Sequence, residues 1–212
     1  MNTATQPIKL QTKKTFSIPD LHIFASNNFD GARLNNLTKL NDSTVTAFIE
    51  PENTPINNSA YYAFDIWSTI DRDIYIKFKY PKEFTHRYLP KIKREHHWTL
   101  LDSNKIIASK KAFTMKLDVS RKKIRVAAQE VHSSTKVKSW YTQLTKNNPQ
   151  FVKLTKIGTS KLGRELVVLD LYKETQKNKP IIVLLTRQHP PEVTGYFAFQ
   201  EFVQTIITDE LS

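Results

Sequence analysis

A histidine and a glutamate stand three positions apart late in the chain, as His189 and Glu192, with Pro190 and Pro191 between them. A neutral imidazole and a carboxylate at this spacing can converge on one metal ion when the backbone between them is rigid, and proline fixes φ. Zinc accepts nitrogen and carboxylate-oxygen ligands in a tetrahedral site, and catalytic zinc sites combine three protein ligands with a water molecule. The pair could therefore supply part of a zinc site.

The same two residues also have an ordinary structural explanation. His189 could cap or pack at the end of a strand, and Glu192 could occupy a first helical turn, where a carboxylate favours the helix dipole. The pattern His-x-x-Glu is short and common, so the pair alone does not decide between a ligand role and a structural role.

The elements around the pair determine how it would be positioned. Residues 181–185 form a continuous aliphatic run, which predicts a strand buried on both faces. Further on, apolar side chains recur at i, i+3, i+4, i+7 and i+8 and predict one apolar face of a helix: Phe199, Phe202, Val203, Ile206 and Ile207. Open α/β sheets bind ligands beyond the carboxyl ends of their strands, so the pair stands in a suitable place.

Several runs resemble one known family. Residues 187–192, Arg-Gln-His-Pro-Pro-Glu, closely resemble the first metal-ligand motif of the zinc carboxypeptidases, particularly the branch of the cytosolic carboxypeptidases and their bacterial relatives. Residues 157–171 resemble the glycine-marked hairpin that precedes the motif strand in that family. Residues 24–32 and 63–68 are similar to the amino-terminal β-domain of that branch, so the resemblance covers nearly the whole chain in the family's order.

The resemblance implies a zinc metallocarboxypeptidase that hydrolyses a carboxy-terminal peptide bond with zinc-activated water. It implies that His189 and Glu192 are zinc ligands. Arg187 becomes a candidate substrate contact, and the alternative is that Arg187 forms a salt bridge at the end of the strand. Arg164 is expected to fix the hairpin rather than to touch substrate. The family's third ligand, a histidine on a later strand, and its general-base glutamate both follow the first motif. We therefore expect both beyond Ser212, no general base within this chain, and a fragment without peptidase activity of its own.

Composition indicates a folded protein without thiol chemistry. The 212 residues are 39% hydrophobic and include 23 aromatic side chains, as expected of a globular protein. The chain has no cysteine, which excludes disulfides, thiolate zinc sites and a cysteine nucleophile. No apolar run approaches the ~20 residues that span a bilayer, and the amino terminus has no apolar signal core. We expect a cytoplasmic protein with no membrane partner, or a periplasmic or secreted one if a signal peptide was removed.

Positive charge is concentrated in the first part of the chain. The net charge is +12, and residues 71–125 hold 16 Lys and Arg against 6 Asp and Glu, whereas residues 181–212 carry a net −3. A basic surface attracts polyanions, although alternating strands also place lysines toward solvent. No nucleic-acid-binding motif accompanies the charge, so we expect no nucleic-acid partner. The expected partner is the carboxy-terminus of a peptide or protein, with an acidic tail as one option.

Strand signals dominate residues 16–130, after a flexible lead-in at residues 1–15. Apolar residues alternate with polar ones at Tyr62, Phe64 and Ile66, and again from Ile74 to Ile76 and Phe78. Such alternation predicts half-buried antiparallel strands, and we expect further strands near residues 21–25, 44–49, 97–101, 112–117 and 123–128. Many short strands separated by turn residues predict an antiparallel β-sandwich.

The pattern changes to mixed α and β signals over residues 131–212. Val137, Trp140, Tyr141 and Leu144 predict a helix over residues 134–147 with a serine or threonine cap. A hairpin of residues 152–157 and 165–171 should follow, then the motif strand and helix. These elements predict the opening part of an α/β/α carboxypeptidase domain with a mixed sheet, incomplete in this chain. The fold class is therefore mixed α+β.

Two other functions stay open at this point. A zinc deacylase or amidase of the same fold would share the His-x-x-Glu motif and differ in its substrate pocket. A basic β-sandwich that binds a partner without catalysis would need no complete metal site. The chain has no Gly-x-Ser-x-Gly run, so nothing supports a serine hydrolase.

Overall fold

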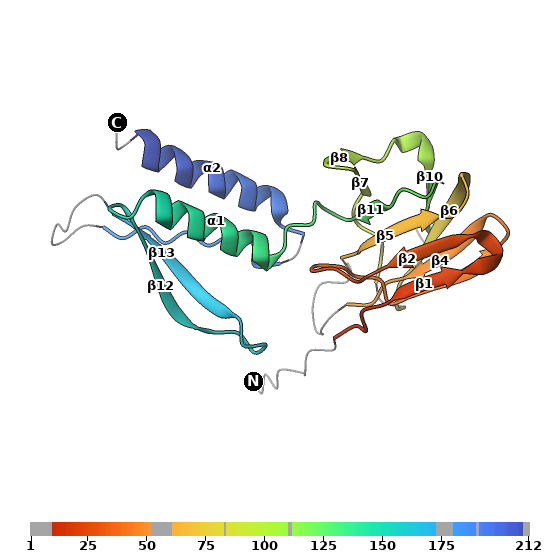
Figure 1. The fold of residues 1–212 in the computed structure, drawn as a ribbon, viewed down its shortest axis with the longest axis horizontal. Coiled ribbons are helices and arrows are strands. Elements are labelled where there is room, and N and C mark those ends of the chain that lie inside the picture. The colour runs from red at the N-terminus through yellow and green to blue at the C-terminus, as the bar shows by residue number, and fades with distance from the viewer. Residues whose placement is uncertain are drawn as a thin grey trace. The chain divides into compact units, whose positions relative to one another are not determined.

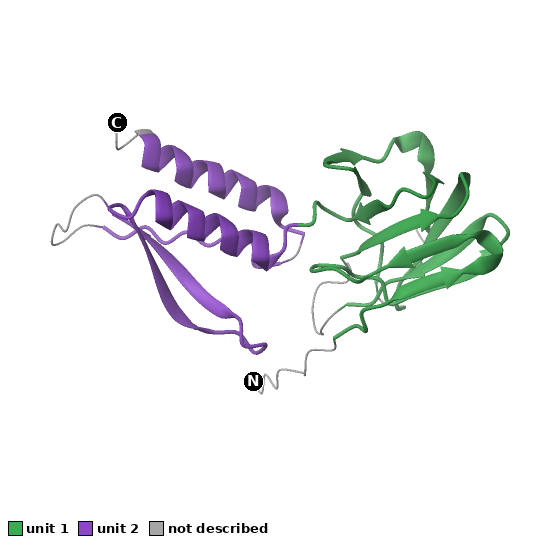
Figure 2. Cartoon of the chain, viewed as in Figure 1, with its two compact units in different colours: residues 1–131 green, residues 132–212 purple. Residues whose placement is uncertain are grey.

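Two stretches of different periodicity form two separate units, Met1–Val131 and His132–Ser212 (Figure 2). The computed structural model describes residues 10–51, 61–82, 84–109, 112–172, 180–189 and 191–209. Most of the expected lead-in and Pro190 lie outside the described residues. Each unit is described by itself.

The described part of the first unit consists of short strands and two single-turn 3₁₀ helices, η1 and η2 (Figure 1). In chain order these elements are β1 (Thr15–Ile18), η1 (Pro19–Leu21), β2 (Ile23–Ser26), β3 (Asn36–Asn41), β4 (Thr44–Phe48), β5 (Ala63–Ser68), β6 (Arg72–Lys79), β7 (Lys91–Arg94), β8 (His97–Leu100), η2 (Ser103–Lys105), β9 (Ile106–Ala108), β10 (Phe113–Val119) and β11 (Ile124–Ala127).

These strands form two sheets within the described residues. The first has the order β1-β2-β5-β11-β7-β8, and the second has the order β3-β4-β6-β10-β9. All the pairs are antiparallel except β4 with β6, which is parallel. The predicted antiparallel sandwich is confirmed, with this one parallel pair as an exception among the described strands. The parallel pair arises because β5, between β4 and β6 in the chain, belongs to the other sheet.

Alternation of side chains gives the two sheets one shared core. The residues predicted to face inward, such as Phe64, Ile66, Ile74 and Ile76, have no exposed surface. They belong to one apolar cluster with residues of both sheets, including Met115. Fully burying a side chain of this size contributes about 1.5–3 kcal/mol, so this cluster is the main source of stability in the unit.

Strands with a strong apolar alternation were predicted, and strands with little of it were missed. The prediction did not include β1, β3, β7 and β9. Three of these, β1, β3 and β9, are edge strands, and both β3 and β7 bury a single residue. Edge strands expose most side chains, so their sequences carry less of the period-two signal.

The second unit contains α1 (Ser134–Asn147), β12 (Val152–Thr159), β13 (Glu165–Leu171) and α2 (Val193–Asp209). The predicted helix over residues 134–147 is confirmed, and its cap is Ser133, whose hydroxyl accepts a hydrogen bond from the Lys136 N–H. The predicted hairpin is confirmed as an antiparallel pair. Gly163, at φ 73°, occupies the left-handed conformation that its turn requires.

Helices α1 and α2 pack on each other and on the hairpin. Leu144 of α1, Val152 of β12, and Val203 and Ile207 of α2 form one buried cluster. Figure 1 shows the two helices side by side above the long hairpin. Neither of the described helices is both long enough and apolar enough to cross a membrane.

The prediction of a buried strand at residues 181–185 is wrong for the described chain. The segment pairs with none of the described strands, and Ile181 is 87% exposed and Leu185 79% exposed. A strand is defined by backbone hydrogen bonds to neighbours on its edges. Among the described residues, β12 and β13 pair only with each other, so the aliphatic run has no sheet to join.

The predicted apolar face of α2 is partly corrected. Val203 and Ile207 are buried as expected, but Phe202 is 50% exposed. Val193 and Tyr196 are buried in its place. The helix is apolar on more than one face, and the packing of α1 selects the face that is buried.

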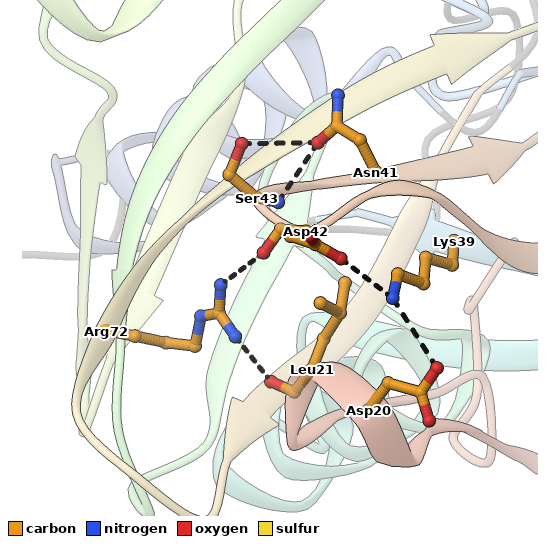
Figure 3. Close-up of polar contacts among 7 residues, drawn as sticks. All are labelled: Asp20, Leu21, Lys39, Asn41, Asp42, Ser43 and Arg72. Atoms are coloured by element: carbon orange, nitrogen blue, oxygen red, sulfur yellow. Dashed lines mark hydrogen bonds and ion pairs between the residues drawn. The ribbon is translucent and has the colours of Figure 1, made fainter.

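One arginine connects the two sheets of the first unit (Figure 3). The Arg72 guanidinium, at the start of β6, donates to the carbonyl of Leu21 at 2.9 Å and to the carbonyl of Asp42 at 2.8 Å. Leu21 lies in η1, between β1 and β2, whereas Asp42 lies in the turn between β3 and β4. Lys39 adds ion pairs to Asp42 and to Asp20. The cluster fixes this end of the sandwich.

We expect Arg72→Ala to lower the free energy of unfolding by about 1–2 kcal/mol, because two carbonyls lose a charged donor. Urea denaturation of the chain measures this change. Arg121→Ala is the matched control, since the exposed Arg121 guanidinium donates to one carbonyl, that of Thr69, and should cost about 0.5 kcal/mol or less. Equal effects of the two substitutions would contradict the role assigned to Arg72.

A histidine is held inside the aromatic end of the same core. The His86 ring stacks on Phe113 with centroids 3.5 Å apart, and its Nδ1 lies 2.7 Å from the Tyr80 hydroxyl. Burial lowers the pKa of His86 from 6.5 to about 4, against a smaller opposite effect of the Tyr88 backbone. The ring is therefore neutral at pH 7.

We expect the first unit to lose stability as the pH falls from about 6.5 to 4. In this window the unfolded chain binds a proton on His86 and the folded chain does not, so the free energy of unfolding decreases as pH decreases. Allowing for the partial exposure of the ring, the decrease is about 1–2 kcal/mol. Urea midpoints at pH 7 and pH 4.5 measure it, and His86→Phe should show a smaller decrease. An unchanged pH dependence in that variant would contradict the prediction.

Candidate metal centre

The candidate pair lies at the junction between the extended run and α2. Arg187 has φ 52°, a left-handed conformation that is uncommon for a residue with a Cβ. It marks a change in chain direction two residues before His189. The helix α2 then begins at Val193, directly after Glu192.

The structure brings His189 and Glu192 into direct contact. The Nδ1 atom of His189 lies 2.7 Å from the Oε1 atom of Glu192. The second carboxylate oxygen, Oε2, accepts the His189 backbone N–H at 3.1 Å. The Glu192 N–H in turn donates to the His189 carbonyl at 3.2 Å. The spacing of three residues thus brings the two side chains into contact, and their role as metal ligands stays a prediction.

Part of this arrangement is a helix cap. A glutamate side chain that reaches back to the N–H three residues earlier is half of a capping box. The hydrogen bond from the His189 side chain lowers the pKa of the Glu192 carboxyl, and the His189 backbone N–H adds to the effect. The carboxylate is therefore ionised at neutral pH, as a metal ligand must be.

The two donor atoms fit a zinc ion as a pair of ligands. Two ligands about 2.0–2.1 Å from zinc at the tetrahedral angle lie about 3.3 Å apart, so a small side-chain rotation separates the present contact from that spacing. Both side chains are accessible, with 62% of His189 and 46% of Glu192 exposed. No group of three or more potential ligands occurs among the described residues. Within the described residues, His189 and Glu192 are thus two candidate zinc ligands without a third.

The Arg187 guanidinium lies 5.7 Å from the centre of the Tyr196 ring, one turn into α2. Burial raises the pKa of Tyr196 to about 12, with a smaller opposite effect of Arg187. Arg187 therefore packs on the helix that carries Glu192. Its role as a substrate contact stays a prediction.

Arg164 contacts the start of α1 and the turn of the hairpin rather than the candidate pair. Its side chain donates to the Ser134 hydroxyl at the start of α1, and its backbone N–H donates to the Ser160 hydroxyl at 3.1 Å. These contacts hold the turn of the hairpin and connect it to α1, which agrees with the structural role expected for Arg164.

One histidine near α2 received no role from the sequence. The His132 ring lies 5.0 Å from the Tyr196 ring and 5.3 Å from the Phe197 ring. An isolated histidine in a sequence gives no sign of such a contact, because the partners follow more than sixty positions later in the chain. It packs on the first turn of α2 rather than on the candidate pair.

The sequence around the pair matches a known family. The family model of the zinc carboxypeptidases matches residues 137–210, which include His189 and Glu192. The match covers about a third of the chain, from α1 to the end of α2. No curated protein matches the chain.

The fold is that of solved metallo-carboxypeptidases. The chain resembles a metallo-carboxypeptidase from Burkholderia cenocepacia with a TM-score of 0.72 and 15% identity, over 87% of this chain and 48% of that one. A protein from Shewanella denitrificans, described as a carboxypeptidase A, gives a TM-score of 0.72 and 15% identity over 88% and 49% of the two chains. At this identity the likeness establishes the fold alone.

The chain spans about half the length of these solved proteins. Its mixed α+β architecture is the carboxypeptidase fold predicted from the sequence. The segment that carries His189 and Glu192 is the segment that matches the zinc carboxypeptidase family.

Proposed function

We propose that the chain is part of a zinc-dependent metallocarboxypeptidase that hydrolyses the carboxy-terminal peptide bond of a peptide or protein. One observation carries the proposal: His189 Nδ1 and Glu192 Oε1 lie 2.7 Å apart inside the segment that matches the zinc carboxypeptidase family. The resemblance of residues 24–32 and 63–68 supports the cytosolic carboxypeptidase-like branch for the first unit.

Each residue of the pair has a defined task in this proposal. The His189 imidazole would offer Nδ1 and the Glu192 carboxylate would offer an oxygen to the zinc ion. Zinc, when bound, polarises the scissile carbonyl and activates a water molecule. The His189 ring and the His189 backbone N–H both lower the pKa of the Glu192 carboxyl, and the backbone hydrogen bond would keep the carboxylate ionised once Nδ1 gives up its proton to bind zinc. The first turn of α2 fixes the spacing between the two side chains.

The proposal assigns the remaining parts of the reaction to residues outside the described chain. The family resemblance places a third ligand and the general-base glutamate after the first motif. Two ligands hold zinc weakly, and without a base the bound water is not deprotonated productively. We therefore propose that this chain by itself does not hydrolyse peptides.

We expect the metal-free chain to bind one zinc ion weakly, with an affinity that falls at least about tenfold in His189→Ala and in Glu192→Gln. Isothermal calorimetry on dialysed protein measures the stoichiometry and the affinity. His22→Ala is the matched control, because His22 is exposed in the first unit and contacts the Thr69 hydroxyl. Tight binding that His189→Ala leaves unchanged would place the metal elsewhere and contradict the proposal.

We expect no release of the carboxy-terminal residue from blocked dipeptides when the chain is supplied with zinc, because the family resemblance places the general base after the first motif. Chromatography of the released amino acid measures the rate. A rate with zinc that exceeds the rate without zinc, and that falls to the zinc-free rate in His189→Ala, would contradict the proposal that the chain alone is inactive. A longer protein that contains the chain should be active and should lose activity in the same variant.

A further inference from the structure

Arg187 has a backbone conformation that strand pairing does not explain. Among the described residues other than glycine, His22 and Glu95 also have a positive φ. His22 ends the helix η1, and Glu95 lies in the turn between β7 and β8. Arg187 instead follows residues 181–185, which pair with none of the described strands. A left-handed residue with a Cβ persists only where surrounding contacts hold it, so contacts of the Arg187 side chain are candidates for that role.

The segment before α2 is least exposed at the same position. From residue 180 to residue 189, every residue is exposed except Thr186 and Arg187, which are half-buried. A segment without strand pairing and with exposed side chains has few contacts that fix its position. The contact that Arg187 makes with α2 is therefore an attachment for a segment that is otherwise exposed.

The ring that receives the Arg187 guanidinium is itself held in place. The guanidinium lies 5.7 Å from the centre of the Tyr196 ring, within the range of a cation–π interaction. Tyr196 is only 3% exposed, and its ring lies 6.0 Å from the ring of Trp140 in α1. The Gln200 side chain donates to the Tyr196 hydroxyl at 3.3 Å. A buried ring between two packed helices gives the cation a fixed partner.

The contact between Arg187 and Tyr196 closes a loop around the candidate pair. His189 follows Arg187 by two positions, and the Tyr196 N–H donates to the Glu192 carbonyl at 3.4 Å. Both candidate ligands therefore lie between the two ends of the loop. Closing a loop reduces the number of conformations open to the residues inside it, and metal sites depend on outer contacts that orient their ligands.

We propose that Arg187 is a positioning residue, whose guanidinium on the Tyr196 ring fixes the turn before His189. The turn then presents the His189 imidazole to the Glu192 carboxylate. The inference rests on the proposed function only for the identity of the pair as zinc ligands. The positioning itself exists in the metal-free chain and can be measured there. It gives Arg187 a role that requires no contact with substrate.

Hydrogen exchange of backbone amides in the metal-free chain tests the positioning. Positions 190 and 191 are prolines, which have no N–H, so the amides of His189 and Glu192 report this turn. Each of them donates to the other residue. Arg187→Asn removes the guanidinium but keeps a residue type that tolerates the left-handed conformation. Exchange at both amides, measured by NMR at one pH and temperature, should become about threefold faster or more.

Arg187→Lys keeps a cation that can lie over the ring, so its exchange should stay within about twofold of the original chain. Arg87→Asn is the matched control, because the Arg87 guanidinium lies 5.5 Å from the centre of the Tyr88 ring in the first unit. Loss of that contact should leave the two amides unchanged. Unchanged exchange in Arg187→Asn, or equal acceleration in Arg187→Lys and Arg187→Asn, would overturn the proposal. Thermal unfolding checks that each variant is folded.

Zinc calorimetry on the same variants separates this inference from the proposed function. The zinc affinity should fall about threefold or more in Arg187→Asn and stay within about twofold in Arg187→Lys. If the original chain binds no zinc but the exchange difference is present, the proposed function fails and the positioning by Arg187 stands. If His189→Ala abolishes zinc binding but Arg187→Asn changes neither affinity nor exchange, the zinc ligands stand and the positioning by Arg187 is overturned.

Discussion

The apolar faces of the two sheets in the first unit must cover each other, and most features of that unit depend on this burial. Phe64 and Ile66 from one sheet and Ile76 and Met115 from the other belong to one cluster without exposed surface. Because side chains alternate along a strand, the residues between these core positions lie on the outer faces of the sheets, where most are at least partly exposed but Ala63 and Ala127 are buried in a second cluster with Val131. The same requirement that builds the core therefore also determines which residues form the outer surface.

Lysines occupy many of the outward positions, and this explains the basic charge of the first unit. Lys77 and Lys79 of β6 and Lys116 of β10 point outward from strands whose other face is buried. Several exposed cations find acidic partners, such as Arg94 and Lys105 on Asp118. Part of the basic charge of the first unit is therefore paired with acidic side chains.

In the second unit, the contact between His189 and Glu192 combines a helix cap with the proposed pair of zinc ligands. The carboxylate accepts the His189 N–H as a helix cap and touches the imidazole as a potential co-ligand. Packing of α2 on α1 through Leu144 and Val203 fixes the helix that carries Glu192. The exposed run at residues 181–185 precedes the pair without a sheet around it. The local geometry of the pair is therefore set by the helix rather than by a strand.

Features that depend on residues a few positions apart could be predicted from the sequence. They are the strands with strong alternation, α1 with its cap, the hairpin, and the contact between His189 and Glu192. Pairings between distant segments followed only from the tertiary structure. The sequence did not indicate that β4 and β6 are parallel, that edge strands such as β3 exist, or that the Arg72 guanidinium connects η1 to the turn at Asp42. It also predicted a buried strand at residues 181–185, since an aliphatic run has the same pattern whether or not neighbouring strands are present. Only the tertiary structure could decide this, because burial depends on what packs against a segment.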